Sequence, residues 1–259
     1  MKFESLTWLS IIKREKGGYF IKYQSLYIHD FVTFKKYGTR FKLTYHKLPV
    51  RQKGFETGLS RITGINTEKL QNNIIRAKAK VYEYAMCNVF DYFVTLTIDA
   101  KKYNRTDLKT YYKDFRQFLK DYSKKHNIKI EYLFIPEKHK DGSWHMHGFI
   151  KGLPASHIIK NKYGYLDWED YNYKFGYISM DRIKNQQAVS KYITKYINKD
   201  LQDSIKDLNA HLYYCSQRLK TAVEIKRGIL SDNNTPFEFE NEYVKINWYN
   251  SDIALSIID

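Results

Sequence analysis

The chain has 259 residues, enough to bury a sizeable hydrophobic core, and 44 Lys and Arg against 28 Asp and Glu give it a net charge of +16. This excess of positive charge is more than solubility requires, so it favours a polyanionic partner, with nucleic acid as the first candidate. The 24 Tyr and 15 Phe residues fit that partner, because aromatic rings among basic side chains bind single-stranded nucleic acid, although most of them also suit strands and core.

The sequence also argues against several other classes of protein. Cys87 and Cys215 are far apart and have no metal-ligand spacing, so neither a disulfide framework nor a cysteine zinc site is expected. No signal peptide and no apolar run of about 18 residues are present, so we expect no membrane partner and a cytoplasmic location. No G-x-x-x-x-G-K-[ST] motif occurs, so a P-loop helicase is not expected in this chain.

Residues 1–66 are predicted to form an N-terminal β-rich accessory region. Alternating aromatic residues in Tyr19–His46 indicate two or three strands, with turns near Asp30 and Tyr37–Gly38. The basic, aperiodic stretch Lys47–Ile65 then indicates a loop or boundary. Pattern alone leaves open whether this region reads DNA or covers a sheet.

Residues 67–259 are predicted to form the main domain, packed with the N-terminal region as one globular unit. Its elements follow the order helix, strand, helix, three strands and helix. This order predicts an α+β fold with an antiparallel-rich central sheet and helices packed mainly on one face. The expected elements are Thr67–Asn88, Phe93–Ile98, Arg105–His126, Lys129–Pro136, Ser143–Lys151, Gly176–Met180 and Asn185–Lys199.

The stretch WHMHGF carries two histidines in an expected strand. Alternate side chains of a strand share a face, so His145 and His147 point together while Met146 points away. Such a pair suits a metal site, although a hydrogen-bonded histidine pair is the plainer interpretation. A third ligand would be a carboxylate or another imidazole. Glu137, on the paired strand, is the first candidate, and His139 has the same strand parity and competes with it.

The last expected helix contains the sequence SKYITKYINKD. At about 100° per residue, Tyr192, Lys195, Tyr196 and Lys199 share one face. Taken alone, this pattern favours tyrosines packed partly in the core and lysines in solvent. A phenol can also attack a phosphodiester, but its ordinary pKa near 10 keeps it protonated at neutral pH. Neighbouring cations and a divalent metal would provide the activation that such a nucleophile needs.

These motifs, in this order, resemble those of the HUH endonucleases. The matching stretches are Phe93–Thr97 (FVTLT), Glu137 with Trp144–Phe149 (WHMHGF), and the Tyr192/Tyr196 helix. They are most similar to rolling-circle replication initiators of the two-tyrosine class, from single-stranded DNA phages and plasmids. The resemblance covers about Tyr92–Lys220 and implies a ferredoxin/RRM-like HUH palm as the core of the α+β fold.

The resemblance implies a role for each candidate residue. His145 and His147 would hold a divalent metal with Glu137 as the third ligand. The residue types alone also suit zinc or other first-row ions, whereas the family implies Mg²⁺ or Mn²⁺. Tyr192 and Tyr196 would form 5′-phosphotyrosine links. Lys195 and Lys199 would steady the phosphate or assist proton transfer, while Thr95 and Thr97 are expected to hold the sheet.

The implied function is nicking and rejoining of single-stranded DNA at an origin, in the cytoplasm of a bacterial host. The implied partners are single-stranded DNA or an origin hairpin, together with a host helicase and polymerase. The sequence leaves the oligomeric state and the origin open. Alternatives are an HUH transposase with the same chemistry, or a non-catalytic DNA-binding module. A conjugative relaxase is disfavoured because its tyrosine precedes its histidines.

Overall fold

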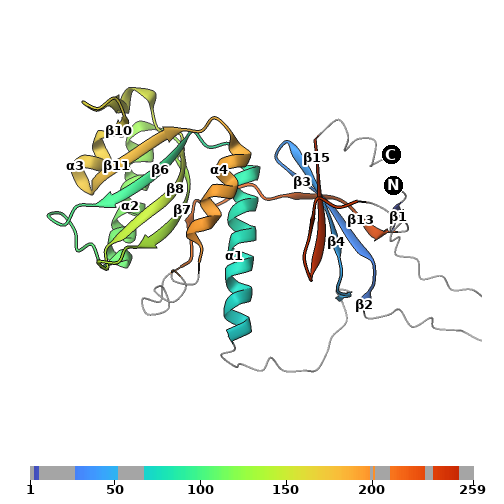
Figure 1. Cartoon of the computed structure of the whole chain (residues 1–259). Coiled ribbons are helices and arrows are strands. Elements are labelled where there is room, and N and C mark those ends of the chain that lie inside the picture. Colours follow the sequence, from blue (N-terminus) through green and yellow to red (C-terminus); the bar gives the residue numbers. More distant parts are fainter. Residues whose placement is uncertain are drawn as a thin grey trace, which may run out of the picture. The chain divides into compact units, whose positions relative to one another are not determined.

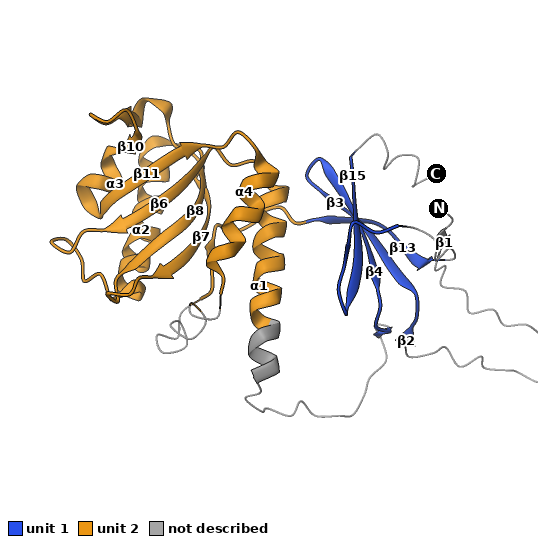
Figure 2. Cartoon of the chain, in the orientation of Figure 1, with its two compact units in different colours: residues 1–63, 222–259 blue, residues 64–221 orange. Residues whose placement is uncertain are grey.

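The computed structural model describes residues 3–5, 27–51, 67–198, 201, 211–230 and 236–250. These belong to two compact units, residues 1–63 with 222–259 and residues 64–221 (Figures 1 and 2). The predicted boundary after residue 66 is close to the observed one. Residues 222–259, however, were expected in the second unit and instead belong to the first, because their strands pair with N-terminal strands.

The first unit forms, among its described residues, a six-stranded antiparallel sheet in the order β1-β13-β3-β4-β15-β14, with β2 and β5 paired separately. Its small core contains Val32, Phe34 and Leu43. Gly38 turns the chain between β3 and β4 with φ of 60°, as the sequence predicts. The bounds are β1 Phe3–Ser5, β2 Tyr27–Ile28, β3 Phe31–Tyr37, β4 Arg40–His46, β5 Val50–Arg51, β13 Val223–Leu230, β14 Phe239–Glu240 and β15 Val244–Asn250. The rest of the predicted strand region, residues 19–26, and most of the predicted loop, residues 52–65, lie outside the described residues.

The second unit contains, in its described part, a seven-stranded antiparallel sheet in the order β12-β7-β8-β6-β11-β10-β9, with four α-helices. This arrangement confirms the predicted α+β class. Pattern reasoning missed the short elements η1 to α3, which precede β11. The bounds are α1 Thr67–Cys87, β6 Tyr92–Ile98, α2 Leu108–His126, β7 Glu131–Lys138, β8 Trp144–Lys151, η1 Ala155–His157, β9 Ile158–Lys160, β10 Leu166–Trp168, α3 Glu169–Lys174, β11 Gly176–Arg182, α4 Gln186–Ile193, η2 Thr194–Tyr196 and β12 Tyr214–Cys215.

One face of this sheet packs against α2 and α3. The even-numbered residues of β6 are all buried, as period-2 alternation requires. Phe115 of α2 is fully buried and contacts Phe134 of β7 and Tyr171 of α3. The α2 side chains that complete this apolar stripe are Leu108, Tyr111, Leu119 and Tyr122. Burial of this stripe is the main source of stability for the helix, since isolated helices of such length are marginal in water.

The other face is covered over part of its area by α4, which packs beside α1 (Figure 1). Phe93 points to this face and meets the ring of Tyr192 edge-on, with centroids 5.5 Å apart. Helices therefore lie on both faces, whereas the sequence predicts them mainly on one. Among the described helices, none combines the length and apolar character needed to cross a membrane.

Gly148 fixes how closely β7 and β8 approach each other. A Cβ at this position would lie 2.1 Å from the Leu133 carbonyl oxygen and 2.6 Å from Cδ1 of Phe134. Only a residue without a side chain fits there. The resulting register pairs His145 with both Glu137 and Thr97, and pairs His147 with Thr95.

The predicted helix Asn185–Lys199 ends early. The α-helix spans Gln186–Ile193, and a single 3₁₀ turn, Thr194–Tyr196, follows it. The Thr194 hydroxyl donates a hydrogen bond to the Lys191 carbonyl at 2.8 Å, the type of local bond by which Ser and Thr compete with the helix. Lys199 lies outside the described residues.

Candidate active site

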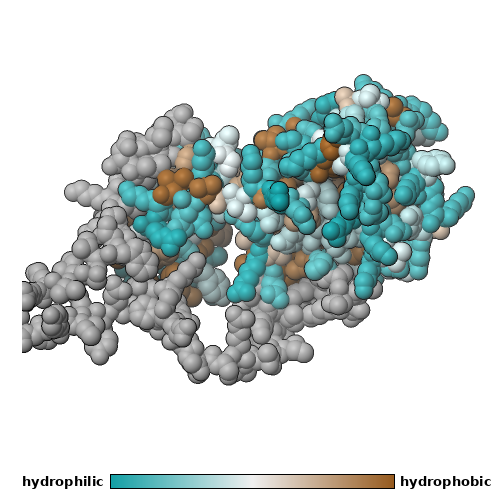
Figure 3. Space-filling model, turned by 180° about the vertical axis from the view of Figure 1, so that it is seen from behind, coloured by the Kyte–Doolittle hydropathy of each residue, from teal (hydrophilic) through white to brown (hydrophobic). Residues whose placement is uncertain are grey.

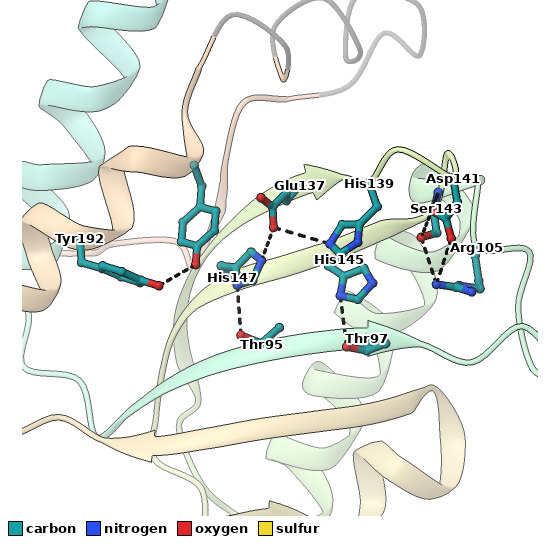
Figure 4. A network of polar contacts seen from close by, with 11 residues as sticks. Thr95, Thr97, Arg105, Glu137, His139, Asp141, Ser143, His145, His147 and Tyr192 are labelled. Atoms are coloured by element: carbon teal, nitrogen blue, oxygen red, sulfur yellow. Dashed lines mark hydrogen bonds and ion pairs between the residues drawn. The ribbon is translucent and has the colours of Figure 1, made fainter.

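The two histidines of β8 are held by two threonines of β6 (Figure 4). Thr95 Oγ1 lies 3.0 Å from His147 Nδ1, and Thr97 Oγ1 lies 3.2 Å from His145 Nδ1. Both Nδ1 atoms are therefore engaged, and Nε2 is left as the outward nitrogen of each ring. The threonines were expected only to hold the sheet, and they also orient the imidazoles.

Glu137 contacts the same pair. Its Oε2 lies 2.6 Å from His147 Nε2 and 3.7 Å from His139 Nε2. His139 stacks on His145, with ring centroids 3.9 Å apart and planes 9° from parallel. Both predicted candidates for the third ligand thus lie at the histidine pair, and only Glu137 bonds to one of its rings.

Burial keeps both rings neutral. Together with smaller contributions from His139 and His147, it lowers the pKa of His145 to about 4. The pKa of His147 is also lowered by burial, although Glu137 acts in the opposite direction. A neutral imidazole retains a lone pair on one nitrogen, which is the form that binds metal ions.

The tyrosines lie directly beside the histidines. The ring of Tyr196 stacks on that of His147, with centroids 4.0 Å apart and planes 8° from parallel. The Tyr192 hydroxyl lies 3.1 Å from the Tyr196 hydroxyl. The histidine motif of β8 and the tyrosine motif of α4 and η2 therefore meet at one place in the fold. Figure 4 shows Tyr192 pointing toward this cluster.

Lys195 gives the two tyrosines different environments. Its Nζ lies 3.7 Å from the ring centroid of Tyr192 and 4.7 Å from that of Tyr196. Hydrogen bonding from Lys195, and then from Tyr196, lowers the pKa of Tyr192. Burial and the bond to Tyr192 instead raise the pKa of Tyr196. Lys199 lies outside the described residues, so its predicted place beside these groups stays a prediction.

Sequence reasoning missed one cation at the site, Arg105. Its Nη2 donates to Ser143 Oγ at 3.0 Å and lies 3.8 Å from Asp141 Oδ2. Its positive charge is one of the groups that lower the pKa of His145. No motif spacing marks this residue, because it precedes α2 and reaches β8 only through the fold, where its carbonyl accepts from the Trp144 amide at 2.9 Å.

The donor set agrees in chemistry with a divalent metal ion. Two neutral imidazoles and one carboxylate are common ligands of first-row ions. Their arrangement is not yet that of a cage: within the described residues, no three His, Cys, Asp or Glu side chains are grouped to hold a metal ion. The bond between Glu137 and His147 occupies both partners. An ion would have to replace that bond.

Residues 91–201 match the family model of the replication-associated protein of the ORF2 type. The matched segment contains every candidate site residue and leaves out the first unit. It is less than half of the chain, and it supports a replication initiator that binds DNA. No curated protein and no solved structure matches the chain significantly. The nicking chemistry and the two-tyrosine class go beyond this match.

Proposed function

We propose that the protein initiates replication by nicking and rejoining single-stranded DNA at an origin through tyrosine transesterification. The observation that carries this proposal is the pair of hydroxyls, those of Tyr192 and Tyr196, which lie 3.1 Å apart where the Tyr196 ring stacks on that of His147. Two phenols at this distance can act in turn on one phosphate. The family match supports the role in replication, and the chemistry is our inference.

The proposed reaction exchanges one phosphodiester for another. The phenol oxygen bonds to phosphorus, the bond from phosphorus to the 3′ oxygen breaks, and the phenol proton is balanced by the proton taken up by the leaving 3′ oxygen. The product is a 5′-phosphotyrosine and a free 3′-hydroxyl, which primes a host polymerase after a host helicase or a hairpin has exposed the strand. No water is consumed, so the reverse step can rejoin the ends.

Tyr192 is the residue that we expect to attack first. Its side chain is 46% exposed, and the ammonium group of Lys195 stabilises its phenolate. Tyr196 is half-buried, and the pKa of its phenol is raised. Tyr196 would then serve in the second cleavage, after synthesis has regenerated the site. Lys195, and Lys199 if it lies nearby, would also hold the phosphate.

His145, His147 and Glu137 are the residues that would hold a divalent ion, Mg²⁺ or Mn²⁺. When bound, such an ion polarises the scissile phosphate and stabilises the charge that develops there. Thr95 and Thr97 keep the two rings in place through their Nδ1 atoms, as partners behind metal-bound histidines commonly do.

The test is a covalent adduct. Full-length protein is incubated with divalent metal and pooled single-stranded oligonucleotides, and the denatured protein is probed for attached DNA, whose ends are sequenced. We expect an adduct with the wild type and none with the Tyr192→Phe and Tyr196→Phe double variant. The single variants show which tyrosine acts first. Tyr173→Phe is the matched control, because Tyr173 is 89% exposed and belongs to α3.

The metal is tested in the same assay. We expect a chelator to abolish the adduct and His147→Ala to lower its rate by at least about 100-fold, since one ligand and the support for Tyr196 are both lost. An adduct that persists in the double tyrosine variant would refute the tyrosine mechanism. An adduct that is indifferent to both chelator and His147→Ala would refute the metal site alone.

A further inference from the structure

A second polar hollow lies on the opposite side of the seven-stranded sheet. It has a volume of about 990 Å³ between α2 and the edge strands β7 and β12, and an adjoining hollow of about 600 Å³ shares Tyr112, Arg116 and Tyr132 with it. Tyr132 and Glu137 differ in strand parity, so the hollow and the candidate active site open on different faces. Nothing in the proposed reaction uses this groove.

Four cations of α2 line the groove in one stripe. Lys109, Lys113, Arg116 and Lys120 follow the spacing four, three, four, which keeps them on one helix face over about 16 Å. All four side chains are exposed, and within the described part of the chain none forms an ion pair. Seen from behind in Figure 3, the described surface of this unit is mostly hydrophilic.

One carboxylate, that of Asp114, also lines the groove. Its Oδ2 accepts a hydrogen bond from the Tyr103 hydroxyl at 3.4 Å. Asp107, which begins the helix, uses its Oδ1 to cap the Thr110 amide at 3.0 Å. Positive charge therefore exceeds negative charge along the stripe by a wide margin.

The floor of the groove offers hydroxyls rather than open ring faces. Tyr112 stacks on Tyr214 at 3.8 Å, and Tyr132 stacks on Phe134 at 5.0 Å. The hydroxyls of Tyr112 and Tyr132 lie 3.1 Å apart. Single-stranded DNA is bound largely by stacking of its bases on exposed rings. A duplex instead presents phosphates, which cations and hydroxyls bind.

We propose that this groove binds the phosphate backbone of duplex DNA. This goes beyond the nicking reaction and rests on the proposed function only in taking DNA as the common ligand. The stripe would give a contact that is independent of base sequence, while the tyrosine face acts on the exposed single strand. Arg116 stands at the centre of this contact, because it lines both hollows.

The test compares two variants of the full chain with equal net charge. The groove variant changes Lys109, Lys113, Arg116 and Lys120 to Gln. The control variant changes four exposed lysines outside the groove, Lys124, Lys125, Lys160 and Lys162, to Gln. Binding to a mixed-sequence duplex and to a single-stranded oligonucleotide is titrated over a range of salt, and thermal unfolding confirms that both variants fold.

For the groove variant, we expect the slope of log affinity against log salt on duplex DNA to become shallower by about 3 to 4, since each phosphate contact contributes about 0.9. The control should stay close to the wild type, and Arg116→Gln alone should change the slope by about one. Equal losses in both variants would overturn the proposal in favour of a general charge effect, and a loss confined to the single strand would also overturn it. The covalent adduct is a separate readout, so failure of the nicking mechanism and failure of the groove can be told apart.

Discussion

The two faces of the seven-stranded sheet are built by the same strands and perform different tasks. On β8, Trp144 and Met146 are fully buried in the core under α2, while His145 and His147 project to the other face. Because successive side chains of a strand alternate, each strand of five or more residues supplies both faces at once. The core face thus holds the backbone on which the site is mounted.

The faces also differ in how their side chains are satisfied. Under α2 and α3 the packing is aromatic, and the buried hydroxyls of Tyr111 and Tyr171 bond to each other at 2.8 Å. On the site face each imidazole is tied to a threonine, and Glu137 bonds to His147. A change on the core face should therefore alter stability, whereas a change on the site face should alter chemistry with less effect on stability.

The largest effect that we expect is on the core face, from Phe115→Ala. This ring is fully buried, and four aromatic neighbours lie within 6 Å of its centroid. Removing it should lower the free energy of unfolding by about 3 to 5 kcal/mol, through lost burial and a cavity. Chemical denaturation monitored by circular dichroism measures this change.

Phe118→Ala is the control for this substitution, because Phe118 belongs to the same helix and is only partly buried. It should cost clearly less than Phe115→Ala. Equal losses for the two variants would show that the α2 face is not the rigid half of the sheet, and the contrast between the faces would fail.

The core face could be predicted from the sequence because it follows periodic rules. The apolar spacing of Arg105–His126 gives α2, which begins at Leu108, and the alternation of Phe93–Ile98 gives β6. The segment between β8 and β11 was missed because η1, β9, β10 and α3 are each six residues or fewer. Elements that short carry too little periodicity to be recognised.

The site was only partly predictable. The pairing of His145, His147 and Glu137 follows from strand parity and a hairpin, both local features. Arg105 could not be predicted, since tertiary contact alone brings it to β8. The separation of Tyr192 from Tyr196 by pKa also depends on burial, which the helical pattern does not specify.

The second prediction compares the two threonines behind the histidines. Thr95→Val and Thr97→Val keep the side-chain shape and remove one hydrogen bond to His147 and His145, respectively. We expect each to weaken metal-dependent adduct formation by roughly tenfold, the lower end for partners behind metal ligands. The metal concentration that gives half-maximal adduct should rise, while the maximum at saturating metal changes less.

Thr110→Val is the matched control, because Thr110 is an exposed residue of α2, the helix on the opposite face from the histidines. If the two β6 variants behaved like this control, the threonines would serve only the sheet. Their contribution to the site face would then be no greater than the sequence alone indicates.

The smallest effect that we expect is a dependence of stability on pH from the partly buried His145. Its pKa is lowered from the ordinary 6.5 to about 4 in the folded chain. Between these values the unfolded chain takes up a proton that the folded chain does not, so the stabilisation is complete above the unfolded pKa and is lost as the pH falls through the folded one. The ring is partly exposed, so we expect a loss on the order of 1 kcal/mol.

Thermal unfolding in the presence of a chelator, from about pH 7 down to about pH 4.5, measures this loss in the window where the histidine titrates. The His145→Gln variant should show a flatter profile over the same window. The carboxyl group of Asp141 also has a lowered pKa, because it accepts hydrogen bonds from Ser143, but it titrates in more acidic solution and is present in both proteins. Superimposable profiles for wild type and variant would mean that burial on the site face does not hold this ring neutral, and that this face is as open to protons as the unfolded chain.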